Sequence, residues 1–153
     1  MAKILVVAEH DGQTLNPSTA KTVAAATSID GADVDVLVLA GSAATVAAEA
    51  AALKPVSKVL TAESEAYAHP VAAKQAPQVA ALAPGYSHVF GPSTTFGRDL
   101  MPRVAALLGV NQVSDLMSVE GERTFKRPIY AGSAVVTVEV PAGVPVVATI
   151  RTA

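Results

Sequence analysis

Hydrophobic and polar positions follow a repeating order over roughly the first ninety residues of the chain. A continuous apolar run, rich in β-branched side chains, occupies residues 4–8, and a second run, apolar except for Asp35, occupies residues 34–40. Such runs are typical of strands that are buried on both faces of a sheet. The stretch between them, residues 16–29, begins with Asn16-Pro17-Ser18 and then supplies an apolar side. A capping side chain followed by a first-turn proline predicts a helix here, between two buried strands.

The same alternation of strand and helix continues to residue 90. Glycine and proline mark the breaks between segments, because glycine favours turns and proline interrupts helices. The expected elements are, in order, an alanine-rich helix over about 41–53, a short strand at 58–60, a helix over 66–82 that Pro70 and Pro77 interrupt, and a strand at 87–90.

The pattern changes in the last third of the chain. Four extended runs follow one another there, at residues 113–120, 125–130, 134–140 and 144–150. The Ala131-Gly132-Ser133 turn folds one run back on the next, so this part is expected to be antiparallel or mixed. The fold class is therefore α/β: a mostly parallel sheet sandwiched by helices, with antiparallel strands near the C-terminus. A chain of 153 residues forms one such domain.

Composition narrows the possible functions. The chain is 51% hydrophobic and 16% charged with a net charge of −2, and its densest basic run is Lys126-Arg127. A nucleic-acid or acidic-membrane surface is therefore not expected. Cysteine is absent, which excludes disulfides, thiolate nucleophiles and cysteine-ligated metal centres. The first apolar run reaches Glu9 and Asp11 after a few residues, so neither a signal peptide nor a membrane span is expected.

A glycine-punctuated, hydroxyl-rich segment, GPSTTFGRDLMPRVAAL at residues 91–107, looks like a phosphate-binding loop. A P-loop requires its second glycine five residues after the first, followed by Lys and then Ser or Thr. Here the spacing from Gly91 to Gly97 is six, and Arg98-Asp99 follows. The dinucleotide fingerprint G-x-G-x-x-G is also missing, both here and after the first strand. Neither nucleotide motif is therefore present.

Two interpretations of this segment remain. The free N–H groups of a helix start, with Thr95 and Arg98 nearby, favour an anion site. Alternatively, Asp99 is the N-cap of an ordinary core helix that ends at Gly109, and its carboxylate repels phosphate. The residues themselves favour the capped helix, and Thr95 and Arg98 stay as secondary candidates for binding an anion.

Other candidate chemistry is sparse. The three histidines, His10, His69 and His88, are scattered and lack the paired spacing of a zinc site. Glu9-His10-Asp11 follows the first strand, where α/β sheets place ligands, and is the best candidate for an acid–base cluster. Successive residues of an extended strand point to opposite faces, however, so the three are not expected to converge. No catalytic residue and no metal site are assigned.

The segment Phe125 to Tyr130 pairs two cations with two aromatic residues. Pro128 within it lacks the N–H that a central strand needs, so the run is expected at a sheet edge. It is either a surface that faces a partner or an ordinary strand with a solvated charge pair. The residues alone describe an α/β domain without evident catalysis.

Several motifs, read in order, resemble one known family. They are VVAEHDGQTLNPST at 6–19, SKVL at 57–60, AYAHP at 66–70, GPSTTFGRDLMPRVAALLGV at 91–110, Ser114-Asp115, and RPIYAG at 127–132. Together they are similar to the N-terminal domain of the electron transfer flavoprotein alpha subunit, across essentially the whole chain. The resemblance implies an adenine-nucleotide-hydrolase-like α/β layer over residues 1–153, without the C-terminal FAD-binding domain of the family.

The resemblance also implies a function and partners. The family's heterodimer takes electrons onto FAD from dehydrogenases, such as the acyl-CoA dehydrogenases of fatty acid beta-oxidation, and passes them to a quinone reductase or another acceptor. The missing domain holds nearly all FAD contacts, and AMP is expected in the beta subunit. This domain is then a scaffold that pairs with beta, and GPSTTFGRDL is a structural turn near an interface.

Two expectations remain beside this interpretation. A stand-alone adenine-nucleotide-binding module is the alternative function, and saturable binding of AMP or ATP by the chain itself distinguishes it. The Met-Ala-Lys start without a transit peptide favours a bacterial cytoplasmic location over the mitochondrial matrix.

Overall fold

A parallel sheet forms the centre of the computed structural model, which describes residues 2–153. Within these residues the sheet has six strands, and every neighbouring pair is parallel. The strands are β1 (Lys3–Val7), β2 (Asp33–Ala40), β3 (Val56–Glu63), β4 (His88–Pro92), β5 (Gln112–Leu116) and β9 (Val146–Ile150). Their order across the sheet is β3-β2-β1-β4-β9-β5.

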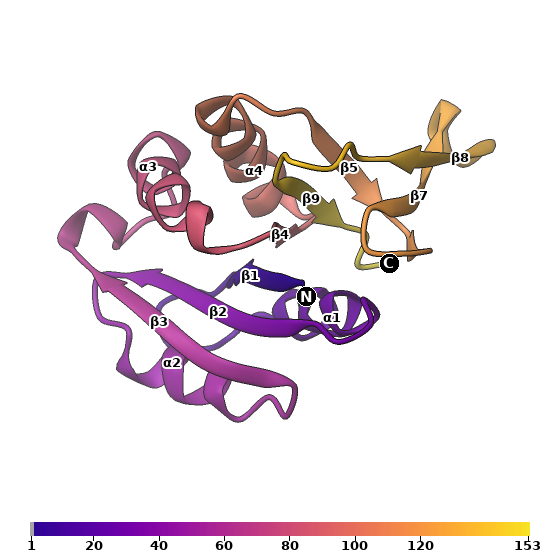
Figure 1. Cartoon of the computed structure of the whole chain (residues 1–153). Helices are drawn as coiled ribbons and strands as arrows, with labels where there is room; N and C mark the ends of the chain where they lie inside the picture. The colour runs from indigo at the N-terminus through magenta and orange to yellow at the C-terminus, as the bar shows by residue number, and fades with distance from the viewer. Residues whose placement is uncertain (1) are drawn as a thin grey trace.

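Helices cover both faces of this sheet, as the sequence predicted (Figure 1). Helices α1 (Pro17–Thr27) and α2 (Ala44–Ala51) pack on one face, and α3 (Ala72–Leu82) and α4 (Thr95–Leu108) pack on the other. Short 3-10 turns lie at Glu65–Tyr67 and Ala83–Gly85. The strands alternate between the two cores: Ile4 and Val6 face α1, whereas Leu5 and Val7 face α3 and α4. This is why the β1 segment is apolar throughout.

A small antiparallel sheet, here called the arm, projects beside β5 (Figure 1). It consists of β6 (Ser118–Val119), β7 (Thr124–Ile129) and β8 (Ala134–Glu139), in that spatial order, with a 3-10 turn at Tyr130–Gly132 between β7 and β8. Phe125 of β7 is fully buried and meets Phe90 of β4 edge to face, with ring centroids 6.5 Å apart. The arm is therefore anchored in the main core.

The last strand leaves the arm and returns to the main sheet. β9 inserts between β4 and β5 and pairs in parallel with both. The mixed arrangement expected for this part of the chain is confirmed: three strands are antiparallel and the fourth run joins the parallel sheet. The apolar run 113–120, predicted as one strand, is instead split between β5 and β6 in different sheets. Within β5, Asp115 has a left-handed φ of 56°, and the register of β5 against β9 shifts there, between Val113 and Leu116.

Two helices differ from the sequence prediction. The run 66–82 becomes a 3-10 turn and then α3, because Pro70 excludes the residue before it from helical conformation. Pro77 lies inside α3 and does not break it. Because proline has no backbone N–H, the carbonyl of Ala73, four residues earlier, lacks its helical hydrogen-bond donor. Ala73 is exposed, so water can supply that hydrogen bond.

The predicted cap of α4 was wrong. Thr94, with φ −106° and ψ 176°, is the N-cap, and its hydroxyl accepts from the Gly97 N–H at 3.4 Å. The helix therefore starts before Asp99, because the chain leaves β4 in an extended conformation that places Thr94 at the helix start. Gly109 does end the helix, with a φ of 70°.

Pro128 was expected to place its strand at a sheet edge, but β7 is the central strand of the arm. β6 pairs only with Phe125 and Lys126. Pro128 lies beyond that pairing and faces Val135 of β8 on its other side. No ladder bond to β6 therefore has to be given up at this position, which is why the proline is tolerated.

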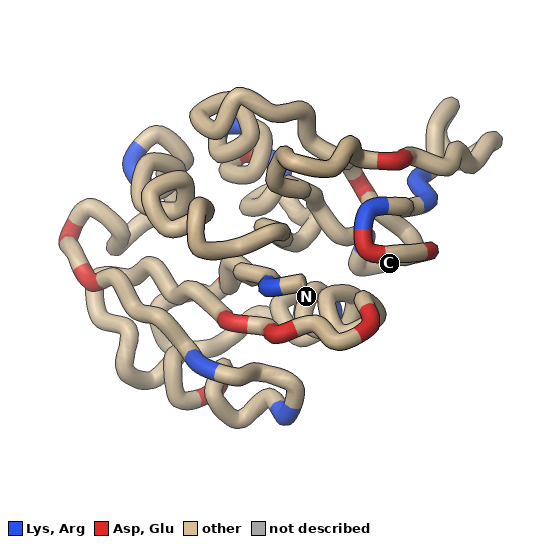
Figure 2. The backbone as a smooth tube through the Cα atoms, viewed as in Figure 1, with Lys and Arg blue, Asp and Glu red and all other residues tan. Residues whose placement is uncertain are grey.

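The surface carries dispersed charge. Figure 2 shows Lys and Arg positions spread over separate elements, with acidic positions among them. Among residues 2–153, every helix is too short or too polar to cross a bilayer.

Candidate functional site

The carboxyl ends of β1 and β4 define the place where this fold class usually binds ligands. From β1 the chain builds outward through β2 to β3, and the later strands then extend from β4 on the other side. The two central strands therefore form a topological switch point, with a crevice outside their carboxyl ends. Glu9 and His10 follow β1 there, and Ser93 and Thr94 follow β4.

The Glu9 carboxylate connects the starts of two helices at this point. Its Oε1 accepts hydrogen bonds from the hydroxyls of Ser18 and Thr94, each at 2.8 Å. Ser18 lies in the first turn of α1, and Thr94 is the N-cap of α4. Helix N-termini carry partial positive charge and favour anions. The Glu9 carboxylate thus lies at the starts of both helices, where their N-termini favour a negative charge.

His10 and Asp11 have separate partners. The Gly12 N–H donates to His10 Nδ1 at 2.9 Å, and His10 Nε2 lies 2.8 Å from the Leu39 carbonyl oxygen. Since a carbonyl can only accept, Nε2 carries the proton. Asp11 Oδ1 accepts from the backbone N–H groups of Gln13 and Thr14. The Thr14 and Gln13 hydrogen bonds lower the pKa of Asp11. Each polar group of the Glu9-His10-Asp11 cluster thus serves local structure.

Thr95 and Arg98, the candidates for an anion site, do not converge on one point. Thr95 is the first residue of α4 and lines a cavity of about 260 Å³ together with Glu9 and Asp99. The exposed Arg98 lies outside that lining, with its Nε 3.5 Å from Ser93 Oγ. Two carboxylates and no cation line the cavity, so these residues do not fit a nucleotide phosphate.

The glycines of residues 91–107 have a packing role. A Cβ on Gly91 would lie 2.7 Å from Cγ of Met101, and a Cβ on Gly97 would overlap the Pro92 carbonyl oxygen. α4 thus crosses β4 so closely that a side chain at Gly97 does not fit, and a side chain at Gly91 fits only if Met101 shifts. The loop is rich in glycine because the helix and the strand are in contact there.

Histidines and acidic residues are also spread apart. Within residues 2–153, no three His, Asp or Glu side chains are grouped as metal ligands. His88 is fully buried on β4, where its Nε2 lies 2.6 Å from the Glu122 carbonyl oxygen and its Nδ1 lies 2.7 Å from Ser87 Oγ. It joins the arm to the sheet.

The profile of the family described as electron transfer flavoprotein domain matches residues 4–153. The chain belongs to this family. It is 50% identical to the electron transfer flavoprotein subunit alpha of Pseudomonas aeruginosa, over 97% of this chain and 48% of that protein. It is 42% identical to the alpha subunit of Paracoccus denitrificans, over 91% of this chain and 44% of that protein.

A mitochondrial alpha subunit from Oryza sativa subsp. japonica is 43% identical, over 96% of this chain and 43% of that protein. The resemblance to the N-terminal domain of the alpha subunit is therefore confirmed. The chain spans less than half the length of each of these electron transfer flavoprotein subunits.

Sequence reasoning missed the hydrogen bonds of Glu9. Thr94 lies 85 residues away from it along the chain, and only the pairing of β1 with β4 brings the two together. The available signal was Ser18 at the predicted start of the first helix and the hydroxyl-rich segment that follows the predicted strand 87–90. That segment suggested an anion site, but the partner of both the Ser18 and the Thr94 hydroxyls is an internal carboxylate.

Proposed function

We propose that this chain is the scaffold and subunit-interface domain of a heterodimeric, FAD-containing electron carrier. The carrier accepts electrons from dehydrogenases, among them acyl-CoA dehydrogenases, and passes them to a quinone reductase or another acceptor. The match over nearly the whole chain to proteins named electron transfer flavoprotein subunit alpha carries this proposal. FAD is held mainly by a further domain of the alpha subunit, AMP is bound by the beta subunit, and a bacterial cytoplasm is the proposed location.

The switch-point geometry supports a role without ligand chemistry of its own. Glu9 and its two hydroxyl donors satisfy one another, and α4 packs on β4 without a gap at Gly97. A rigid α/β layer of this kind can hold a flavin domain and a second subunit in place while the flavin supplies the redox chemistry.

We place the contact with the beta subunit on the arm. Three of the six exposed large hydrophobic side chains of residues 2–153 lie on or beside it: Met117, Tyr130 and Val135. Tyr130 is 79% exposed, and a projecting aromatic side chain is a common interface anchor. β8 is an edge strand of the arm, so its outward N–H and C=O groups are available for pairing with another chain.

The test is complex formation between this chain and the beta subunit, measured by light scattering after size-exclusion chromatography. A one-to-one complex is expected, and Val135→Arg is expected to weaken it by more than tenfold, because a charge then lies in an apolar contact. Val71→Arg, at an exposed apolar position before α3, is the matched control and should not change binding. Equal binding by both variants would refute the placement on the arm.

A second measurement separates the proposed carrier from the stand-alone nucleotide module. Intact mass and visible absorbance of the native protein report whether this sequence occurs within a larger yellow flavoprotein. Titration of the 153-residue chain with AMP reports nucleotide binding directly. A colourless protein that binds AMP saturably would replace the proposed function with the nucleotide module.

A further inference from the structure

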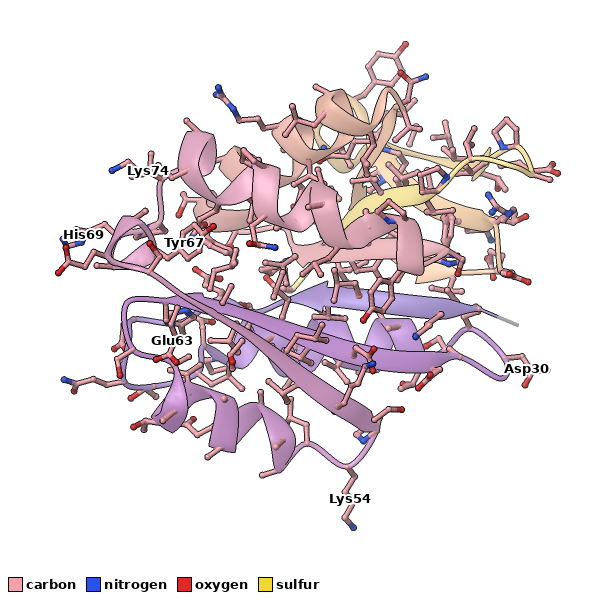
Figure 3. The ribbon with its side chains drawn as sticks, turned by 60° about the vertical axis from the view of Figure 1, so that its left-hand side comes forward. Asp30, Lys54, Glu63, Tyr67, His69 and Lys74 are labelled. Atoms are coloured by element: carbon pink, nitrogen blue, oxygen red, sulfur yellow. The ribbon has the colours of Figure 1, made fainter. Side chains whose placement is uncertain are left out.

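Two Asp-Gly pairs lie on the surface of the protein in segments that connect regular elements. Asp11-Gly12 follows β1, and Asp30-Gly31 lies between α1 and β2. All four residues are exposed, and both glycines have a left-handed φ, 94° at Gly12 and 69° at Gly31. Figure 3 shows Asp30 projecting outward from its turn. The pairs thus share their residue types, exposure and glycine conformation, and they differ in their hydrogen bonds.

Hydrogen bonds hold both reactive groups of the Asp11-Gly12 pair. The Asp11 carboxylate accepts from the N–H groups of Gln13 at 2.9 Å and Thr14 at 2.7 Å. The Gly12 N–H donates to His10 Nδ1 at 2.9 Å. The Thr14 and Gln13 hydrogen bonds also lower the pKa of Asp11, so less of its carboxyl group is in the neutral acid form. The side-chain carboxyl and the following backbone nitrogen are therefore each bound to other groups.

The Asp30-Gly31 pair has no such partners. Within residues 2–153 the Asp30 carboxylate accepts no hydrogen bond and forms no ion pair, and the Gly31 N–H has no acceptor. One bond closes this turn, from the Ala32 N–H to the Ile29 carbonyl at 3.1 Å. Opening of that single exposed-turn bond frees the peptide between Asp30 and Gly31 to rotate. Glycine has no Cβ to hinder the approach of its nitrogen to a neighbouring carboxyl group.

We propose that Asp30 is a site of spontaneous isoaspartate formation and that the hydrogen bonds of Asp11 protect the other pair. The Gly31 nitrogen attacks the side-chain carboxyl carbon of Asp30, a new C–N bond forms, and the amide proton leaves with the carboxyl hydroxyl as water. Water then opens the resulting succinimide ring. Cleavage at the backbone carbonyl carbon gives isoaspartate, and cleavage at the side-chain carbonyl carbon restores aspartate. Water is the only reactant, and the site does not depend on the function proposed above.

The test is incubation of the folded protein at neutral pH in water enriched in heavy oxygen, followed by digestion and mass spectrometry. Ring hydrolysis adds one heavy oxygen to the modified peptide, and electron-based fragmentation distinguishes isoaspartate from aspartate. Isoaspartate is expected at Asp30. Its formation at Asp11 should be at least about tenfold slower, because hydrogen bonds to a charged group must break first. Methyl transfer from S-adenosylmethionine by an isoaspartyl methyltransferase gives an independent measure of the product.

The chain unfolded in urea is the reference for the intrinsic rates. Both pairs lack their native hydrogen bonds there, so Asp11 and Asp30 should isomerise at similar rates. Asp30→Glu should abolish the signal at residue 30 and leave that at Asp11 unchanged, because the longer side chain closes its ring slowly. His10→Phe removes the acceptor of the Gly12 N–H. It should speed isomerisation at Asp11 about fivefold, as for the loss of a hydrogen bond between neutral groups.

Two results would overturn the proposal. If isoaspartate formed in urea but not at Asp30 of the folded protein, the single bond between Ala32 and Ile29 would be enough to prevent the reaction, and Asp30 would not be a site. If the folded protein isomerised equally fast at Asp11 and Asp30, the hydrogen bonds of Asp11 would give no protection. An unchanged rate at Asp11 in His10→Phe would contradict the part assigned to the Gly12 N–H.

Discussion

His88 of β4 is hydrogen-bonded through both ring nitrogens, and its Nε2 connects β4 to the arm. The Glu122 carbonyl accepts from Nε2–H, so Nδ1 is left to accept from the Ser87 hydroxyl. Burial lowers the pKa of His88, and the nearby Arg123 charge also lowers it, against an opposing effect of the Glu122 hydrogen bond. The folded protein therefore keeps this imidazole neutral at a pH where the unfolded chain begins to bind a proton.

This pKa difference predicts a loss of stability in mild acid. Above about pH 6.5, the ordinary pKa of histidine, folded and unfolded chains both hold neutral His88. As the pH falls below that value, only the unfolded chain gains the proton, so the free energy of unfolding decreases by at most about 1.4 kcal/mol per pH unit from this residue. The loss is complete once the pH has passed the lowered pKa of the folded state.

Denaturant unfolding of wild type and His88→Gln between pH 8 and pH 5 checks this prediction. The glutamine cannot titrate, so the stability advantage of wild type over the variant should shrink as the pH falls. A constant difference over the whole range would contradict a lowered pKa for His88 in the folded protein.

At the scale of elements, the contact between α4 and β4 depends on two glycines. A Cβ at Gly97 would overlap the Pro92 carbonyl oxygen, which belongs to the rigid backbone. A Cβ at Gly91 would meet only the flexible side chain of Met101. We expect Gly97→Ala to lower the free energy of unfolding by about 3 kcal/mol or more, because α4 must move, and Gly91→Ala to lower it by about 1 kcal/mol.

Gly85→Ala is the control for this prediction, since a Cβ there has no heavy atom within 4 Å. It should be neutral or slightly stabilising, because alanine restricts the unfolded chain. Urea unfolding of the three variants gives the order. If Gly97→Ala were as stable as Gly85→Ala, the close packing of α4 on β4 would be wrong.

The same elements show how far the sequence predicts this fold. The buried run 34–40 and the glycine stop at Gly109 are local signals, and both are confirmed. Thr94 and Asp99 are both good N-caps by composition. The choice between them depends on how the chain leaves β4, a tertiary feature that no local pattern contains. The position of β9 between β4 and β5 is also set by long-range pairing.

For the candidate site at the carboxyl ends of β1 and β4, the sequence mainly showed which nucleotide-binding motifs are missing. The segment 91–107 lacks the spacing of a P-loop, and the packing reason for its glycines is visible only with Pro92 and Met101 beside them. The burial of Gln75 in α3 gave no signal in the sequence, because a glutamine on a helix is normally exposed. This burial follows from the way α3 packs on the sheet.

For the whole molecule, the arm and the parallel sheet depend on each other. β9 follows the arm in the chain and is an internal strand of the sheet, so the sheet is complete only when the arm has folded back. Phe125 packs against Phe90, the Arg127 Nε–H donates to the Ser114 carbonyl at 2.8 Å, and His88 bonds the arm at Glu122. These contacts should make the arm and the sheet one cooperative unit.

Phe125→Ala tests this coupling. The buried ring fills the core between the arm and β4, so its removal should lower the global free energy of unfolding by about 3–5 kcal/mol. In hydrogen exchange, the amides of Met117 and Val140 in or beside the arm should lose protection together with that of Val146 in the sheet. Val135→Ala, at a half-exposed position on the arm, should change little. Faster exchange confined to the arm, with Val146 still protected, would mean that the arm opens alone and that docking on it need not perturb the sheet.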